Sequence, residues 1–249
     1  MNRREFSALA VSMVASGALN PRNLIAASPI SANGERLNRH LAELRRFGAN
    51  LSGGVTRLAY SDANREGLLA VAQWMREARL EPSIDYAGNL IGRRAGRDRA
   101  LTPIVFGSHI DSVPEGGNYD GNVGSMAAIE VAHTLAELDV RLRHPIEVAI
   151  WSNEEGGLYG SRAVSGQLEP GELDQLSRSG KTIRDGIRFL GGDPARLAQV
   201  RRQRGDIAAY LEMHIEQGGI LHATRTNIGI VEGIVGQSLG AVAATADQE

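Results

Sequence analysis

Two segments in the first third of the chain place apolar residues three and four positions apart, which is the spacing of an amphipathic helix. The first predicted helix covers residues 35–47. The second runs from Asp62, a candidate N-cap, toward Pro82. Residues 83–94 are predicted to form a β-hairpin whose turn contains Gly88, and residues 121–138 are predicted to form a third helix.

Three continuous apolar runs predict strands that are buried on both faces, at residues 103–108, 146–151 and 207–213. A cluster of polar residues follows each of them. Because strand and helix patterns alternate, we expect an α/β fold. In an open α/β sheet, ligands collect outside the carboxyl ends of the strands, so the three polar clusters should meet there. Residues 228–235 also have strand character.

Composition narrows the chemistry. The chain has 249 residues, of which 42% are hydrophobic, enough for one domain and part of a second. A net charge of −2 leaves no broad basic surface, so nucleic acid is not an expected partner. Cysteine is absent, which excludes disulfides, thiolate metal sites and cysteine nucleophiles. Any metal must therefore be held by His, Asp and Glu.

The first 32 residues differ in composition from the rest of the chain. Arg3 and Arg4 precede an apolar run over residues 7–19, and small residues follow near Ala26 and Ala32. This pattern resembles a twin-arginine export signal and predicts a periplasmic protein. The run is too short to span a bilayer, which needs about 20 apolar residues. The alternative is an N-terminal amphipathic helix on a cytoplasmic protein.

The first polar cluster contains His109, Asp111 and Asp120. An imidazole at a strand end can bind a divalent ion, and a carboxylate two residues later can orient its ring. Asp120 is expected to begin the following helix, where backbone N–H groups favour a negative charge. Each residue has an ordinary structural alternative, a hydrogen-bonded histidine or a helix cap.

The second cluster places Glu154 beside Glu155, and the third begins at His214. Adjacent carboxylates repel one another unless a cation compensates them, although on a solvated loop the repulsion is small. In a metal site one carboxylate ligates while the other accepts a proton from water. Three polar clusters at three strand ends, in a protein without cysteine, together favour a metal centre.

Three segments resemble the hydantoinase/carbamoylase group of the M20 dinuclear zinc hydrolases, which includes N-carbamoyl-L-amino-acid hydrolases, allantoate amidohydrolases and β-ureidopropionases. They are GSHIDSVPEGGNYDGNVG at 107–124, WSNEEGGLYGSRAVSG at 151–166 and YLEMHIEQGGIL at 210–221. The resemblance extends from about residue 33 to Gln237. It implies a mixed central sheet flanked by helices, in a dinuclear zinc aminopeptidase-like catalytic domain over residues 33–235.

The resemblance also implies a role for each candidate residue. His109 and His214 would ligate one zinc ion, Asp120 would bridge two ions and Glu155 would ligate the second. Glu154 would be the base, Asp111 the partner of His109, and Gln217 would lie near the substrate. The implied substrate is a small ureido or amide compound. The ligand types also accept Mn²⁺ or Co²⁺ in place of Zn²⁺.

Family members run to about 400 residues, with a lid and dimerisation domain and one more His ligand beyond the region that this chain resembles. Residues 236–249 resemble nothing in the family and suggest an aberrant or truncated start of that domain, so the catalytic domain would be incomplete at its C-terminus. We therefore expect one tightly held zinc, a weak second site and reduced activity. The intact family forms homodimers, and without the dimerisation domain this chain would lack the usual dimer interface. An M20 peptidase or deacylase and a non-catalytic remnant are the alternatives.

Overall fold

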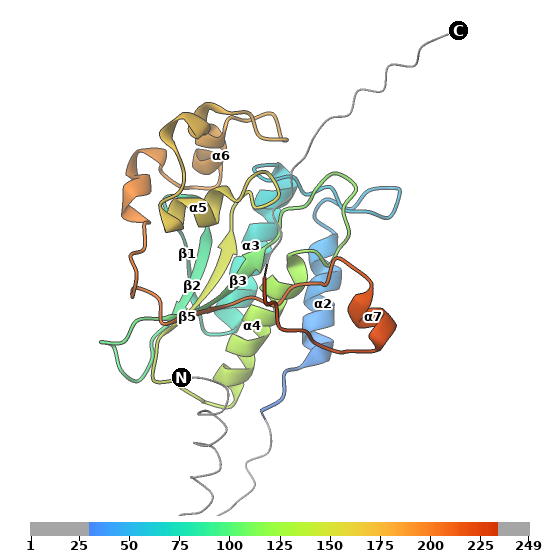
Figure 1. Cartoon of the computed structure of the whole chain (residues 1–249), viewed down its shortest axis with the longest axis vertical. Helices are drawn as coiled ribbons and strands as arrows, with labels where there is room; N and C mark the ends of the chain where they lie inside the picture. The colour runs from blue at the N-terminus through green and yellow to red at the C-terminus, as the bar shows by residue number, and fades with distance from the viewer. Residues whose placement is uncertain (1–29, 234–249) are drawn as a thin grey trace, which may run out of the picture.

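The computed structural model describes residues 30–233, which form a five-stranded mixed sheet with helices packed against it (Figure 1). The strands are β1 (Glu81–Ile84), β2 (Leu90–Arg94), β3 (Ile104–His109), β4 (Ile146–Trp151) and β5 (Ala209–Leu211). Their order is β1-β2-β4-β3-β5, in which β1, β2 and β4 pair antiparallel and β3 pairs parallel with both β4 and β5. The predicted α/β class, with a mixed sheet flanked by helices, is confirmed.

Three helices cover one face of the sheet. They are α2 (Gly34–Arg45), α3 (Asp62–Glu77) and α4 (Asn122–Glu137). Helix α3 packs on β1 and β2, α4 packs on β3 and β4, and α2 lies against α4. Alternate residues of β4, such as Val148 and Ile150, face this layer and are completely buried in the main core.

The opposite face of the sheet is covered only in part. Ile91, Val105 and Ala149 form a small buried cluster there, and they line a cleft of about 420 Å³. Glu147 on this face pairs with Arg93 and Arg202. Shorter elements follow β4 in the sequence: α5 (Tyr159–Ser165), η2 (Pro170–Asp174), α6 (Ile183–Phe189), η3 (Pro194–Gln199) and α7 (Ile220–Thr224).

Two helix starts differ from the sequence predictions. Ser61, rather than Asp62, caps α3, because its side chain accepts a hydrogen bond from the backbone N–H of Asn64. Asp120 does not begin α4. The chain turns at Gly121 with φ +64, and α4 begins at Asn122. The Asp120 side chain therefore does not cap α4.

The third predicted buried strand is wrong in length and in burial. Residues 207–213 contain only the three-residue strand β5, and its residues are exposed. It pairs with β3 along one edge, and within residues 30–233 no strand pairs with its other edge. Residues 228–233 form no strand. The predicted leader before residue 30, the C-terminal segment 236–249 and positions 234–235 lie outside the described residues. Among residues 30–233, no helix is both long enough and apolar enough to cross a bilayer.

Candidate metal centre

His109 is the last residue of β3 and its ring is buried. Nδ1 lies 3.0 Å from the backbone oxygen of Asp111. A carbonyl oxygen only accepts hydrogen bonds, so this contact places the proton of the neutral ring on Nδ1 and leaves a lone pair on Nε2. Nε2 lies 3.5 Å from Oε2 of Glu154. The lone pair of His109 therefore lies beside a carboxylate.

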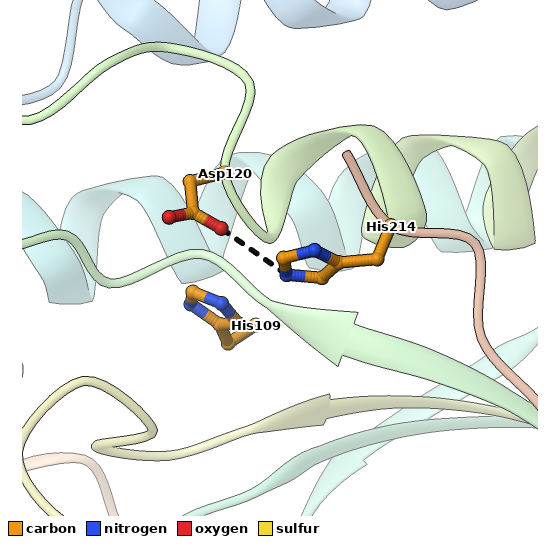
Figure 2. Close-up of side chains that lie close together, drawn as sticks. All are labelled: His109, Asp120 and His214. Carbon is orange, nitrogen blue, oxygen red and sulfur yellow. Dashed lines mark ion pairs between the residues drawn. The ribbon is translucent and has the colours of Figure 1, made fainter. Parts of the chain in front are cut away.

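His214 follows β5 on the neighbouring segment and meets the same arrangement. Its Nδ1 lies 2.9 Å from the backbone oxygen of Ile215, which leaves the Nε2 lone pair facing Oδ1 of Asp120 at 3.1 Å (Figure 2). The ring centroids of His109 and His214 are 6.3 Å apart. Figure 2 shows the two rings and the Asp120 carboxylate turned toward one space at the end of β3.

Asp120 supplies the observation that favours a cation. Its Oδ1 atom is buried and accepts no hydrogen bond from residues 30–233, although Nε2 of His214 lies so close. Its Oδ2 atom accepts a hydrogen bond of 2.8 Å from Nε2 of Gln217. Two lone pairs that face each other at this distance repel unless a proton or a metal cation lies between them. The donor set thus fits a divalent metal ion.

The Asp111 carboxylate lies near the His109 ring and also contacts the loop after β4. Its carboxylate accepts hydrogen bonds from the backbone N–H groups of Glu154, at 3.3 Å, and Glu155, at 3.1 Å. The distance from Asp111 Oδ1 to Nδ1 of His109 is 3.7 Å, so the shorter contact with the ring comes from the Asp111 backbone carbonyl. The side chain therefore connects the end of β3 to the loop after β4.

The candidate ligands form two groups that share one residue. His109, Asp120 and His214 each offer a ligand atom within 4.8 Å of the others, and so do His109, Glu154 and Glu155. Asp120 belongs only to the first group and Glu155 only to the second. All of the residues proposed from the sequence, including Asp111 and Gln217, thus lie at the carboxyl ends of β3, β4 and β5 or on the loops that follow them.

Burial and mutual repulsion disfavour negative charge in this cluster. Burial raises the pKa of Asp111, Glu154 and Glu155 above the usual carboxyl range, and neighbouring carboxylates add to the shift at both glutamates. Burial alone would lower the pKa of His109, but the charges of Asp111 and Glu154 outweigh it and raise that pKa. A divalent cation in this cluster would compensate the negative charges that burial and mutual repulsion disfavour.

Two glycines permit the close packing of the site. A Cβ atom on Gly121 would lie 2.4 Å from the His109 ring, and one on Gly124 would lie 2.2 Å from the backbone oxygen of Met213. The first contact lets the Asp120 loop approach His109, and the second lets the segment before His214 lie against α4. Neither role is visible in the sequence, because the space around a glycine depends on neighbours that are distant in the chain.

The sequence of this chain resembles those of known proteins. Residues 89–179 match the profile of Peptidase family M28. The chain is 44% identical over 208 residues to an N-carbamoyl-L-amino acid amidohydrolase of Geobacillus stearothermophilus, an alignment that covers 82% of this chain and 51% of that protein. It is 33% identical over 210 residues to the allantoate amidohydrolase of Escherichia coli, covering 82% of this chain and 50% of that protein.

A crystal structure of a hydantoinase/carbamoylase family amidase from Burkholderia ambifaria superimposes with a TM-score of 0.72 at 37% identity, covering 79% of this chain and 48% of that one. Over the part that matches, the chain is similar to members of the hydantoinase/carbamoylase family. It spans about half the length of the family relatives that it matches. The residues that converge in the structure are ones that the family resemblance indicated from the sequence.

Proposed function

We propose that this chain forms the metal-binding part of a hydrolase that cleaves linear ureido or amide C–N bonds, as in an N-carbamoyl amino acid or allantoate. The observation that carries the proposal is the buried Asp120 Oδ1 facing the His214 Nε2 lone pair beside His109. The names of the relatives, an N-carbamoyl-L-amino acid amidohydrolase and an allantoate amidohydrolase, supply the substrate class.

In this proposal His109, Asp120 and His214 would hold one zinc ion tightly, while Asp120 and Glu155 would contribute to a weaker second position. Mn²⁺ and Co²⁺ suit the same ligands. A cation bound there supplies Lewis acid chemistry, which polarises a carbonyl oxygen and favours the ionisation of water. Three protein ligands leave room for a further group, as is usual in catalytic zinc sites.

Glu154 is the proposed general base. Its raised pKa, caused first by burial, makes its carboxylate a better proton acceptor than a solvated glutamate. Glu154 would take a proton from the attacking water and pass it to the leaving nitrogen. The hydrogen bonds from backbone N–H groups to Asp111 fix the loop that carries Glu154, so Asp111 would position the base. Gln217, which donates to Asp120, would lie beside the substrate.

The test is hydrolysis by the full chain, freed of metal and then supplied with Zn²⁺, Mn²⁺ or Co²⁺. Release of amino acid from an N-carbamoyl-L-amino acid, and of ammonia from allantoate, is compared with release from an N-acetyl amino acid and a dipeptide. We expect metal-dependent turnover of the ureido substrates. Preference for the dipeptide or the N-acetyl compound would instead indicate a peptidase or deacylase.

Glu154→Gln separates the catalytic proposal from metal binding. We expect its rate to fall by about 10²–10⁴-fold with metal content retained, because general-base catalysis contributes an effect of that size. Glu66→Gln, at an exposed position on α3, is the matched control and should retain the wild-type rate. Metal binding by the wild-type chain without turnover of any substrate would contradict the hydrolase proposal for this chain.

We also propose that residues 1–32 act as a twin-arginine export signal and deliver the protein to the periplasm. The support is the Arg3–Arg4 pair ahead of an apolar run. In a fusion of this segment to a reporter that is active only after export, the double change Arg3→Lys and Arg4→Lys should block export. Export that is unaffected by the double change would contradict this assignment.

A further inference from the structure

Arg57 is fully buried and contacts two of the segments that carry candidate metal ligands. All three guanidinium nitrogens donate hydrogen bonds. Nε donates to the backbone oxygen of Ile110 at 2.6 Å, and Nη1 donates to the backbone oxygens of Leu44 at 2.8 Å and Phe47 at 2.7 Å. Nη2 donates to Oδ1 of Asn122 at 2.9 Å. The planar fork of an arginine thus joins three separate segments of the chain.

This arginine differs from an ordinary buried ion pair. Arg36, also buried, pairs with the carboxylates of Glu130 at 2.7 Å and Glu137 at 2.6 Å. Arg57 forms no ion pair with the residues that the structure describes, and its acceptors are carbonyl and amide oxygens. Burial lowers its pKa to about 10, with the charge of Asp111 acting in the opposite direction, so it remains charged at neutral pH. A buried charge without a direct carboxylate partner is costly.

Two of the four acceptors belong to the segments that carry the candidate ligands. Ile110 lies between His109 and Asp111, and Asn122 lies two residues after Asp120. A single guanidinium therefore connects the end of β3 to the start of α4. The backbone of Arg57 adds two further bonds to the first segment, because its N–H donates to Oγ of Ser112 at 2.9 Å and its oxygen accepts from the N–H of Ser112 at 3.0 Å.

We propose that Arg57 is a positioning residue that fixes the separation between His109 and Asp120 and thereby sets the affinity of the metal centre. The inference rests on the metal-binding part of the proposed function. A lysine at this position would retain the charge, but its single nitrogen cannot reach Ile110 and Asn122 in the same fixed geometry. Residues that orient metal ligands typically contribute about 10–100-fold to metal affinity.

The test uses Arg57→Lys in the full chain, with Zn²⁺ affinity measured by competition with a chromophoric chelator. The visible absorption of the Co²⁺-substituted protein reports ligand geometry. We expect Zn²⁺ affinity to fall by about 10–100-fold and the Co²⁺ bands to shift or lose intensity. Asn122→Ala, which removes one acceptor and leaves Arg57 in place, should shift the Co²⁺ spectrum in the same direction and serves if Arg57→Lys fails to fold.

Arg36→Lys is the matched control, because it weakens a buried arginine that also packs against α4 but contacts Glu130 and Glu137 far along the helix. It should lower the melting temperature and leave Zn²⁺ affinity and the Co²⁺ spectrum at their wild-type values. Unchanged affinity and spectrum in both Arg57→Lys and Asn122→Ala would overturn the role of Arg57. Failure of the wild-type chain to bind Zn²⁺ or Co²⁺ would overturn the metal-binding proposal itself.

Discussion

Oδ1 of Asp120 and Nε2 of His214 lie 3.1 Å apart without a hydrogen bond between them. Both atoms bear lone pairs when the His214 ring carries its proton on Nδ1. The contact is therefore unfavourable in the metal-free protein and becomes favourable when a cation is shared. Asp120 therefore lowers the stability of the metal-free protein while it favours metal binding.

For Asp120→Asn we predict opposite effects on these two properties. An amide Nδ2 can donate to Nε2 of His214, so the free energy of unfolding of the metal-free protein should rise by about 1 kcal/mol. Zn²⁺ affinity should fall by more than about 100-fold, since even residues outside the ligand shell contribute up to that factor. Chemical denaturation and chelator competition measure the two effects. Asp62→Asn, at an exposed position, should change neither.

Gly121→Ala should damage the centre without removing any candidate ligand. The new methyl group would lie 2.4 Å from the His109 ring, at a residue with φ +64. We expect the free energy of unfolding to fall by about 1–3 kcal/mol from the backbone conformation alone, with loss of Zn²⁺ binding. Gly117→Ala, on the same loop with no atom within 4 Å of its added Cβ, is the control. Equal behaviour of the two variants would contradict this account of Gly121.

The Arg36–Glu130 ion pair should make stability depend on pH in the acid range. Burial opposes ionisation of Glu130, but hydrogen bonds from Arg36 outweigh it and hold the pKa of Glu130 below its usual value. A carboxyl group with a lowered pKa stabilises the fold above its unfolded-state pKa, and this contribution disappears as pH falls through the folded-state pKa.

Glu130→Gln should accordingly lower the free energy of unfolding by about 3 kcal/mol at pH 7, because it leaves Arg36 without its buried partner. The difference from the wild-type protein should shrink as pH falls through the lowered folded-state pKa of Glu130, because the carboxyl group is then protonated in both states. Urea denaturation at several pH values measures it, with the exposed Glu35→Gln as control. A difference that does not vary with pH would exclude the ion pair as its source.

Amide hydrogen exchange should be faster in β5 than in β3 and β4. Strand β5 pairs along one edge over three residues, and its Tyr210 and Leu211 side chains are 44% and 51% exposed, so opening it uncovers little buried apolar surface. We expect the addition of Zn²⁺ to slow exchange around His214 selectively. Protection of residues 209–211 equal to that of residues 104–109 in the metal-free protein would contradict this prediction.

The pattern of apolar and polar residues was sufficient to predict the central strands β3 and β4 and the position of the polar residues that follow them. Most residues of the apolar runs of β3 and β4 are buried in the structure, and the polar residues that follow them, His109 and Glu154 among them, lie together as the carboxyl-end rule predicts. His214 follows the third predicted strand, of which only Ala209–Leu211 forms in the structure.

Other features depend on contacts between residues that are distant in the chain, which the spacing of residues in the sequence does not reveal. The run at residues 207–213 has the composition of a buried strand, but the described part of the chain provides no second neighbour for it. Asp111 was expected to orient His109, whereas its carboxylate mainly accepts backbone N–H groups from a loop more than 40 residues away. The burial of Arg57 could not be predicted from the sequence, because an arginine in a short loop usually faces solvent.

His109 belongs to both groups of candidate ligands, yet its Nδ1 faces the Asp111 carbonyl, so the ring has one lone pair to offer. A first cation that takes this lone pair leaves only carboxylate oxygens for a second. The two positions would then differ in chemical hardness, with nitrogen and oxygen donors at one and oxygen donors alone at the other. Such a pair is suited to mixed occupancy, with Zn²⁺ beside the imidazoles and a harder ion such as Mn²⁺ among the carboxylates.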